Sequence, residues 1–89
     1  MAEYTLATYL SSKELGGELF IYNRKNSTIY SFNGTGVFIW TMLNKSVAFD
    51  EISRRMSEEY DVLPATAAED VAAFVKELGE KNLITFHKE

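Results

Sequence analysis

The stretch Tyr30–Leu43, YSFNGTGVFIWTML, decides the fold because it contains the change from extended chain to helix. It begins inside Ser27–Phe32, where β-branched and aromatic residues predict a strand. Asn33–Gly36 then predicts a tight strand-to-helix turn, and either Asn33 or Thr35 is suited to cap the helix that follows. That helix is apolar on most sides and is predicted to lie in the core. Its large apolar residues are Val37, Phe38, Trp40, Met42 and Leu43.

Upstream of this stretch, two more strands are predicted at Tyr4–Leu10 and Glu18–Tyr22, which are also rich in β-branched and aromatic residues. The segment between them, Ser11–Gly17, ends in two glycines and predicts a turn. Asn23–Asn26 is a short polar loop suited to a hairpin. The simplest assembly of these strands with Ser27–Phe32 is a three-stranded antiparallel meander.

Downstream, two further helices are predicted. Phe49–Tyr60 carries apolar residues at helical spacing. The next helix is predicted to begin at Thr66, in a capping-box pattern, and to run to about Lys81, with Asn82 in the left-handed conformation that closes it. The tail Leu83–Phe86 is open to two interpretations, a paired strand or a hydrophobic plug. The whole chain is therefore predicted to be one α+β domain, residues 1–89, with a winged-helix-like order of three strands and then three helices.

The third helix has two apolar edges of different character. A bulky edge, formed by Ala67, Val71, Phe74 and Leu78, is predicted to face the core. The neighbouring flank is apolar but nearly smooth, which allows another backbone to come close. Either another helix packs there or the flank is one wall of a peptide groove. Its residues are Ala68, Ala72, Val75 and Gly79.

Composition restricts the class of function. The 89 residues carry a net charge of -4 and the pI is about 5.0, which argues against a nucleic-acid partner. The chain has no cysteine, so it has neither a disulfide nor a thiolate to bind a metal. Neither a secretory signal nor a membrane-spanning stretch is recognisable, and these features together predict a cytoplasmic protein without a membrane partner.

No arrangement of residues in the sequence predicts catalysis. Nucleophilic catalysis needs a base, usually histidine, and the only histidine is His87, the third residue from the end. Adjacent carboxylates such as Glu58 with Glu59 diverge on a helix instead of converging. Asn33–Gly36 lacks the further glycines and the lysine of a phosphate-binding loop. The chain is therefore predicted not to be an enzyme and to hold neither a metal nor a cofactor.

The order and spacing of these features resemble the PqqD family. The resemblance spans about residues 19–84 and starts from Tyr30–Leu43, with its strand, Asn, small-residue turn and Ile-Trp pair. It continues in Phe49–Ile52 and in the pattern of Asp70-Val71, Phe74-Val75, Leu78 and Asn82–Ile84. The sequence departs from the family pattern at Ala48, where a capping Ser or Thr is usual, and at Asn82, where Gly is usual.

The resemblance implies a peptide-binding role as a RiPP recognition element. Such modules bind the leader segment of a ribosomally made precursor peptide and act as peptide chaperones in PQQ biosynthesis or related pathways. The modifying enzyme they serve is often a radical S-adenosylmethionine (radical SAM) enzyme. The leader is expected to add as a strand beside the third strand and against the third helix. The predicted binding residues are Ser27, Thr28, Ile29, Tyr30, Ser31, Phe32, Ala68, Ala72, Val75 and Gly79.

Two other interpretations remain at the level of sequence. The first is a winged-helix DNA-binding regulator, although the solvated side of its recognition helix would carry a net negative charge. The second is a structural module that dimerises through an open strand edge. The state of the chain is accordingly predicted to be a monomer or a weak homodimer.

Overall fold

Two glycines join the first two strands of the main sheet. In the computed structural model, which describes residues 3–87, Gly16 and Gly17 have φ angles of 59° and 79°. Positive φ at both central residues suits the two-residue turn that matches the twist of a hairpin. It connects β2 (Leu10–Leu15) to β3 (Glu18–Asn23), and the two strands pair in antiparallel register from Leu10 opposite Asn23 to Leu15 opposite Glu18.

A polar loop leads from β3 into β4 (Thr28–Asn33) and completes the sheet in the order β2-β3-β4. The buried Asn23 side chain accepts a hydrogen bond at Oδ1 from the Lys25 amide at 2.9 Å, and Asn26 Oδ1 accepts one from the Thr28 amide at 3.1 Å. These side chains take the place of turn hydrogen bonds in the loop. The predicted three-stranded antiparallel meander is confirmed.

The predicted first strand is wrong in its extent. The segment expected as one strand is divided between β1 (Tyr4–Leu6) and the first residue of β2, and most of the segment expected as a turn is strand β2. The side chains of β2 are mainly polar and exposed, so they carry little strand signal, and β2 is held by its backbone pairing with β3. β1 pairs instead with β5 (Ile84–Phe86), which shows that the tail forms a strand.

The three helices are α1 (Thr35–Asn44), α2 (Phe49–Tyr60) and α3 (Pro64–Glu80). The bounds of α2 agree with the prediction. The N-cap of α1 is Gly34, at φ 60°, and no side chain caps this helix, so the expected capping by Asn33 or Thr35 is wrong. Glycine occupies this position because it tolerates the positive φ.

The predicted start of α3 is also wrong. The helix begins at Pro64 with Leu63 as its N-cap, so Thr66 lies inside the first turn and caps nothing. Proline is well suited to the first helical position because its fixed φ is helical and its missing amide would have no partner there. At the other end, Asn82 has φ 60°, as predicted, and the chain turns into β5.

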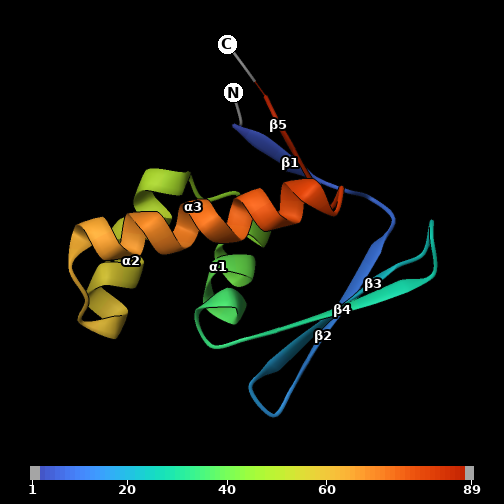
Figure 1. The fold of residues 1–89 in the computed structure, drawn as a ribbon, viewed down its shortest axis with the longest axis horizontal. Coiled ribbons are helices and arrows are strands. Elements are labelled where there is room, and N and C mark those ends of the chain that lie inside the picture. Colours follow the sequence, from blue (N-terminus) through green and yellow to red (C-terminus); the bar gives the residue numbers. More distant parts are fainter. Residues whose placement is uncertain (1–2, 88–89) are drawn as a thin grey trace.

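The core lies where the helices, the main sheet and the small sheet meet. Ile21 of β3, Leu43 of α1 and Leu78 of α3 are all buried, and Trp40 is core as predicted, with 5% of its surface exposed. Tyr4 connects the small sheet to this core, because its hydroxyl donates to the Leu43 and Val47 carbonyl oxygens at 3.2 and 2.8 Å. Figure 1 shows the helices grouped on one side of the main sheet, with β1 and β5 beyond the end of α3.

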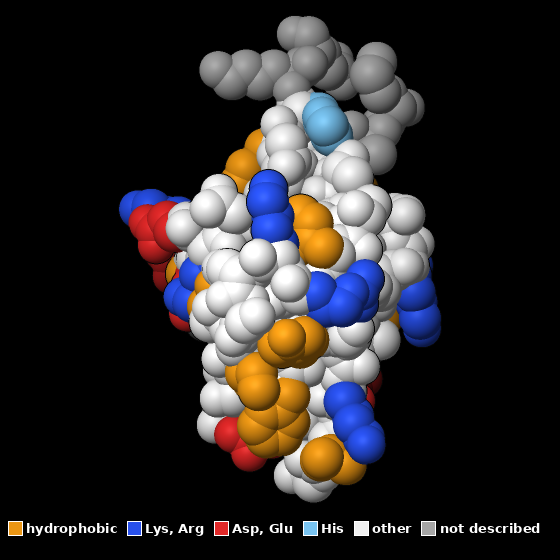
Figure 2. Space-filling model, turned by 90° about the vertical axis from the view of Figure 1, so that its right-hand side faces the viewer, with side chains coloured by type: hydrophobic (Ala, Val, Ile, Leu, Met, Phe, Trp, Pro, Cys, Tyr) orange, Lys and Arg blue, Asp and Glu red, His pale blue; other side chains and the backbone are white. Residues whose placement is uncertain are grey.

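The main sheet covers the core with one face only. Leu19 and Ile21 point inward, whereas Tyr22 and Ile29, which are opposite each other in the register, are 37% and 65% exposed. Figure 2 looks at the side of the molecule that the sheet occupies and shows apolar side chains bordered by Lys and Arg. Among the helices of residues 3–87, none combines the length and apolar character needed to cross a bilayer.

Candidate functional site

The free edge of β4 presents unpaired backbone groups to solvent. The Arg24 amide donates a hydrogen bond to the Tyr9 carbonyl oxygen at 3.0 Å. Counting back from Arg24, every second residue of β3 therefore bonds to β2. Because alternate residues of an antiparallel strand bond to opposite neighbours, the next residues along β3 bond to β4. By the same alternation, Ile29 and Ser31 direct their N–H and C=O groups away from β3 and toward the free edge.

The two edges of the main sheet differ in how they are protected. β2 carries Lys13 and Glu14, both exposed, and charged side chains are a common means of preventing another chain from pairing with an edge. β4 has neither a charged residue nor a proline over its whole length. The β4 edge is therefore the better template for an added strand.

One face of β4 looks toward α3. The Phe32 and Phe74 rings are 5.1 Å apart in an edge-to-face arrangement, and the Lys81 ammonium lies 5.7 Å from the centre of the Tyr30 ring. Lys81 is held in place by an ion pair with Glu77, with Nζ and Oε2 2.9 Å apart. The surface of α3 beside β4 is therefore an aromatic ring followed by a charged pair.

The smooth flank of α3 lies elsewhere, and its predicted position beside β4 is wrong. Ala72, Val75 and Gly79 line a cavity of about 610 Å³ together with β5. A Cβ built on Gly79 would lie 2.9 Å from a ring carbon of Phe86. Because each residue turns a helix by about 100°, Gly79 points about 140° away from Phe74, whose ring packs on Phe32 of β4. The structure thus brings Phe32 together with Phe74 and Tyr30 together with Lys81, and it places the flank on the other side of α3. Ser27 lies in the loop before β4, at φ 58°.

The members of the flank also differ in exposure. Val75 is only 7% exposed and belongs to the core, whereas Ala68 and Ala72 are exposed and Gly79 is half-buried. Phe74 was missed as a site residue because its edge of the helix was predicted to face the core, and Lys81 was considered as the approximate end of the helix. Phe74 and Lys81 follow Ala72 by two and nine residues, and this spacing places both of them on the side of the helix away from Ala72. Only the position of β4 shows which of these two sides borders the open strand edge.

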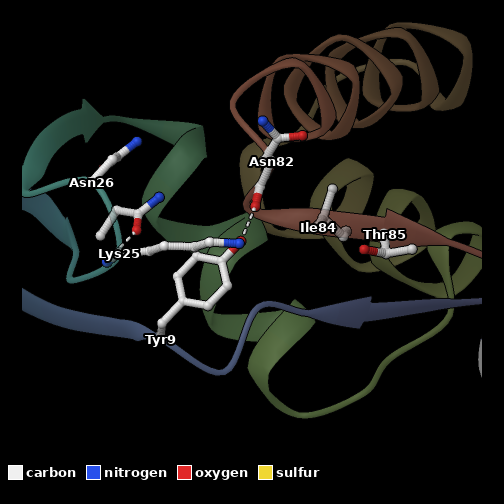
Figure 3. A pocket seen from close by; sticks show the side chains of 7 residues that line it. Tyr9, Lys25, Asn26, Asn82, Ile84 and Thr85 are labelled. Carbon is white, nitrogen blue, oxygen red and sulfur yellow. Dashed lines mark hydrogen bonds between the residues drawn. The ribbon is translucent and has the colours of Figure 1, made fainter.

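A second, polar cavity of about 520 Å³ lies at the hairpin end of the sheet (Figure 3). The Tyr9 hydroxyl donates to the Asn82 carbonyl oxygen at 3.2 Å, and the Lys25 ammonium lies 5.4 Å from the centre of the Tyr9 ring. Three separate segments of the chain supply its lining, so no sequence pattern predicted it. The lining contains no carboxylate; its residues are Tyr9, Asn23, Lys25, Asn26, Asn82, Ile84 and Thr85.

The ionisable groups with displaced pKa values lie away from β4. Burial, together with the nearby Glu3 carboxylate, raises the pKa of Tyr4. On the surface of α2, hydrogen bonds from Arg54 and then Arg55 lower the pKa of Glu51 to about 2. Among residues 3–87, no three His, Cys, Asp or Glu side chains are grouped closely enough to hold a metal ion. What the β4 region offers is therefore backbone hydrogen bonding and apolar contact.

Residues 18–84 match the family model described as Coenzyme PQQ synthesis protein D (PqqD). The match includes all of β3, β4 and the three helices. The chain belongs to the PqqD family. The resemblance seen in the sequence is thereby confirmed. Among curated proteins, none matches this member of the PqqD family significantly.

Two solved structures share the fold of this PqqD-family chain. One is described as TbiB1 in complex with the TbiA(beta) leader peptide. It has a TM-score of 0.86 and 21% sequence identity, and the match covers 94% of this chain and 98% of the other. The second is described as lasso peptide synthetase B1 complexed with the leader peptide, with the same TM-score and identity and a match over 94% and 99% of the two chains. They confirm the predicted α+β, winged-helix-like fold.

Proposed function

We propose that this protein binds the leader segment of a ribosomally made precursor peptide as an added strand on β4 and presents it to a modifying enzyme. The observation that carries the proposal is the uncharged free edge of β4, flanked by an aromatic and charged face of α3. Membership of the PqqD family supports it, as does the fold shared with two proteins whose structures are described as leader-peptide complexes.

The proposed binding mode separates affinity from specificity. Ile29 and Ser31 supply backbone groups that pair with any extended peptide, whatever its side chains. Alternate side chains of the added strand point toward α3, where Tyr30, Phe32 and Phe74 provide apolar contact. The Lys81–Glu77 pair lies at the end of this surface and offers one group of each charge to polar side chains of the leader.

The proposal gives this chain a carrier role and assigns no reaction to it. The chemistry belongs to the partner, which we propose to be a radical SAM enzyme or another peptide-modifying enzyme. We also place the protein in the cytoplasm, where a newly translated precursor and its enzyme meet. The precursor is expected to be encoded as a short open reading frame beside the gene for this protein.

The experiment is an affinity and amide-shift measurement with a synthetic leader made from that neighbouring reading frame. Placing proline at both Ile29 and Ser31 removes two edge amides and should weaken binding at least tenfold. Ala72→Trp is the matched control, because it places a bulky ring on the other side of α3 and should leave leader affinity unchanged. Circular dichroism should show that both variants remain folded.

Amide shifts locate the peptide independently of the variants. Shifts along β4 and around Phe74 and Lys81 are expected. Shifts confined to β2 or to the exposed acidic residues of α3 would count against the site even if the peptide binds. Loss of leader affinity in Ala72→Trp would instead restore the smooth flank as part of the binding surface. Tight, salt-sensitive binding of a random DNA duplex would favour a DNA-binding regulator over the peptide carrier.

A further inference from the structure

The polar cavity at the hairpin end of the main sheet contains a positive charge and no negative one. Its volume is about 520 Å³, and it lies between the β3–β4 loop, the residue before β2 and the turn into β5 (Figure 3). Lys25 is the only charged residue in its lining. The Tyr9 hydroxyl already has a partner, because it donates to the Asn82 carbonyl oxygen at 3.2 Å. A cavity of this composition suits an anion.

Asn23 is a buried residue with a free donor at this cavity. Only 2% of its surface is exposed, and its Oδ1 accepts the Lys25 amide at 2.9 Å, which fixes which end of the side-chain amide faces the loop backbone. Within residues 3–87, its Nδ2 group donates to no other residue. A buried N–H group without a partner costs free energy, so such groups normally have one. Because Asn23 lines the cavity, an acceptor inside it would satisfy this group.

The rest of the β3–β4 loop adds two more donors. Asn26 Oδ1 accepts the Thr28 amide at 3.1 Å, so that its Nδ2 group is also the end of the side chain left for another partner. The Lys25 ammonium lies 5.4 Å from the centre of the Tyr9 ring. In the part of the chain that the structure describes, Lys25 belongs to no ion pair, since the pairs lie on α2 and between Lys81 and Glu77. Two side-chain amides and one ammonium group therefore line the same cavity.

These groups match a carboxylate better than a phosphate. An ionised carboxylate only accepts hydrogen bonds, and its bonds to N–H donors are strengthened by its charge. Its single negative charge is balanced by Lys25 alone, whereas a phosphate carries more charge and is commonly bound by arginine. Figure 2 faces this end of the molecule and shows Lys and Arg side chains spread across it, with Asp and Glu side chains toward the margins. The local charge thus favours an anion, although the chain as a whole is negative.

The register of the sheet places the cavity next in line after the aromatic part of β4. On the face that looks toward α3, the pair Ile21–Tyr30 is followed by the pair Asn23–Thr28, and Asn23 lines the cavity. Every second residue of a strand added to β4 also points to this face. A side chain of such a strand that lies two residues beyond the one next to Tyr30, toward the β3–β4 loop, is therefore directed to the cavity.

We propose that this cavity binds the carboxylate of an acidic side chain of the leader peptide. The inference rests on the proposed function, because it requires the leader to lie along β4. Lys25 balances the charge of the carboxylate, while the Nδ2 groups of Asn23 and Asn26 donate to its oxygens. Backbone pairing alone permits a strand to slip along its partner. One acidic residue held at the hairpin end fixes the register, and with it the part of the precursor that is presented to the enzyme.

The first test couples charges on the protein to charges on the synthetic leader. Lys25→Gln should weaken leader affinity about fivefold, because a bond to a charged group is lost. When each Asp and Glu of the leader is replaced in turn by Asn or Gln, one replacement should weaken affinity by a similar factor and should abolish the effect of Lys25→Gln. Lys13→Gln, an equal change of charge on β2, is the matched control and should leave affinity unchanged. A leader in which no acidic residue couples to Lys25 would overturn the proposal.

Asn23→Asp tests the buried donor in the same assay. The substitution keeps the size of the side chain and an oxygen that accepts the Lys25 amide, so the loop should stay folded, which circular dichroism checks. It replaces the free N–H donor by a second oxygen and adds a negative charge, so leader affinity should fall by about fivefold or more. Unchanged affinity in this variant would show that the carboxylate lies elsewhere.

The side-chain amide resonances of Asn23 and Asn26 test the cavity without the leader. Sodium acetate should shift them in a saturable manner, and sodium chloride at the same ionic strength should not. An equal response to both salts would contradict a carboxylate site. A response to acetate without any coupled leader residue would overturn the leader as the source of the carboxylate.

Amide shifts along β4 separate this inference from the proposed function. The leader should still shift the β4 amides in Lys25→Gln, so failure of the cavity tests with these shifts intact removes the carboxylate site alone. Absence of leader shifts along β4 in the wild-type chain would overturn the proposed function and, with it, the assignment of the cavity to the leader.

Discussion

The two sides of α3 face two open strand edges with different chemistry. Toward β4 the helix presents Phe74 and the Lys81–Glu77 pair, and the strand edge is six residues long. Toward β5 it presents Ala72 and Gly79, and the edge is only three residues long. A longer edge beside a large aromatic ring suits a foreign peptide, which needs many backbone bonds and side-chain pockets. On the β5 side, the absence of a side chain at Gly79 lets the ring of Phe86 pack directly on the helix.

This difference shows that a smooth helical flank does not by itself indicate a ligand site. The smooth flank was expected to be the second wall beside β4, because small residues allow a backbone to approach. The structure gives that place to Phe74, which also contributes to the core. A ring that serves the core on one side and borders the strand edge on the other links leader binding to the stability of the whole domain.

The largest effect on stability is expected when the two sides of α3 are compared through the variants Phe74→Ala and Val75→Ala. Phe74 is 9% exposed and packs edge-to-face on Phe32, so its truncation should lower the free energy of unfolding by about 3–5 kcal/mol. Val75 loses fewer buried atoms, and its truncation should cost about 2 kcal/mol. Urea unfolding of the two variants checks the order, and equal losses would mean that the β4 side of α3 is no more critical than the β5 side.

Gly79→Ala probes the β5 side alone. Alanine is about 0.8–1 kcal/mol more favourable than glycine inside a helix. The added Cβ would lie 2.9 Å from Phe86 Cε2, but this ring is half exposed and can shift. We expect a net gain in the free energy of unfolding of about 0.5 kcal/mol, measured by thermal and urea unfolding. A loss of stability would show that Phe86 is held firmly against α3.

Thr66→Ala tests where α3 begins. The capping-box pattern predicts a loss of about 1 kcal/mol when the cap is removed. In the structure Thr66 lies within the first turn and is exposed. Alanine should therefore raise the free energy of unfolding by roughly a few tenths of a kcal/mol, because its helix propensity is higher. The sign of the change in urea midpoint distinguishes a start at Thr66 from a start at Pro64.

The smallest effect on stability is expected on α2. This helix surface lies outside both sides of α3 and provides a reference for the variants made there. Arg54 and Arg55 lower the pKa of Glu51 from 4.5 to about 2. A lowered pKa in the folded state adds stability above pH 4.5 that is lost as the pH falls toward 2. Glu51→Gln should therefore be slightly less stable than the wild type at neutral pH, and the difference should disappear in acid. A difference independent of pH would assign the effect to something other than this carboxylate.

Much of the fold could be predicted because its signals are local. The β4 strand, the turn at Gly34 and the helix after it follow from neighbouring residues, and so do the bounds of α2 and the left-handed Asn82. The errors in the strands fall where long-range pairing decides. β2 is polar and exposed, so only its partner β3 reveals it as a strand, and β1 finds its partner about eighty residues further along the chain.

By itself, the sequence determined the position of β3 and β4, which residues are helical and which side of each helix is buried, because periodicity and turn residues act over a few positions. It also showed β4 as an unguarded strand, since charge and proline are properties of composition. Only the tertiary structure decided that the smooth flank of α3 faces β5 while Phe74 and Lys81 face β4. A helical pattern orders residues around an axis, but the neighbour on each side depends on how the chain returns from distant segments to pack against it.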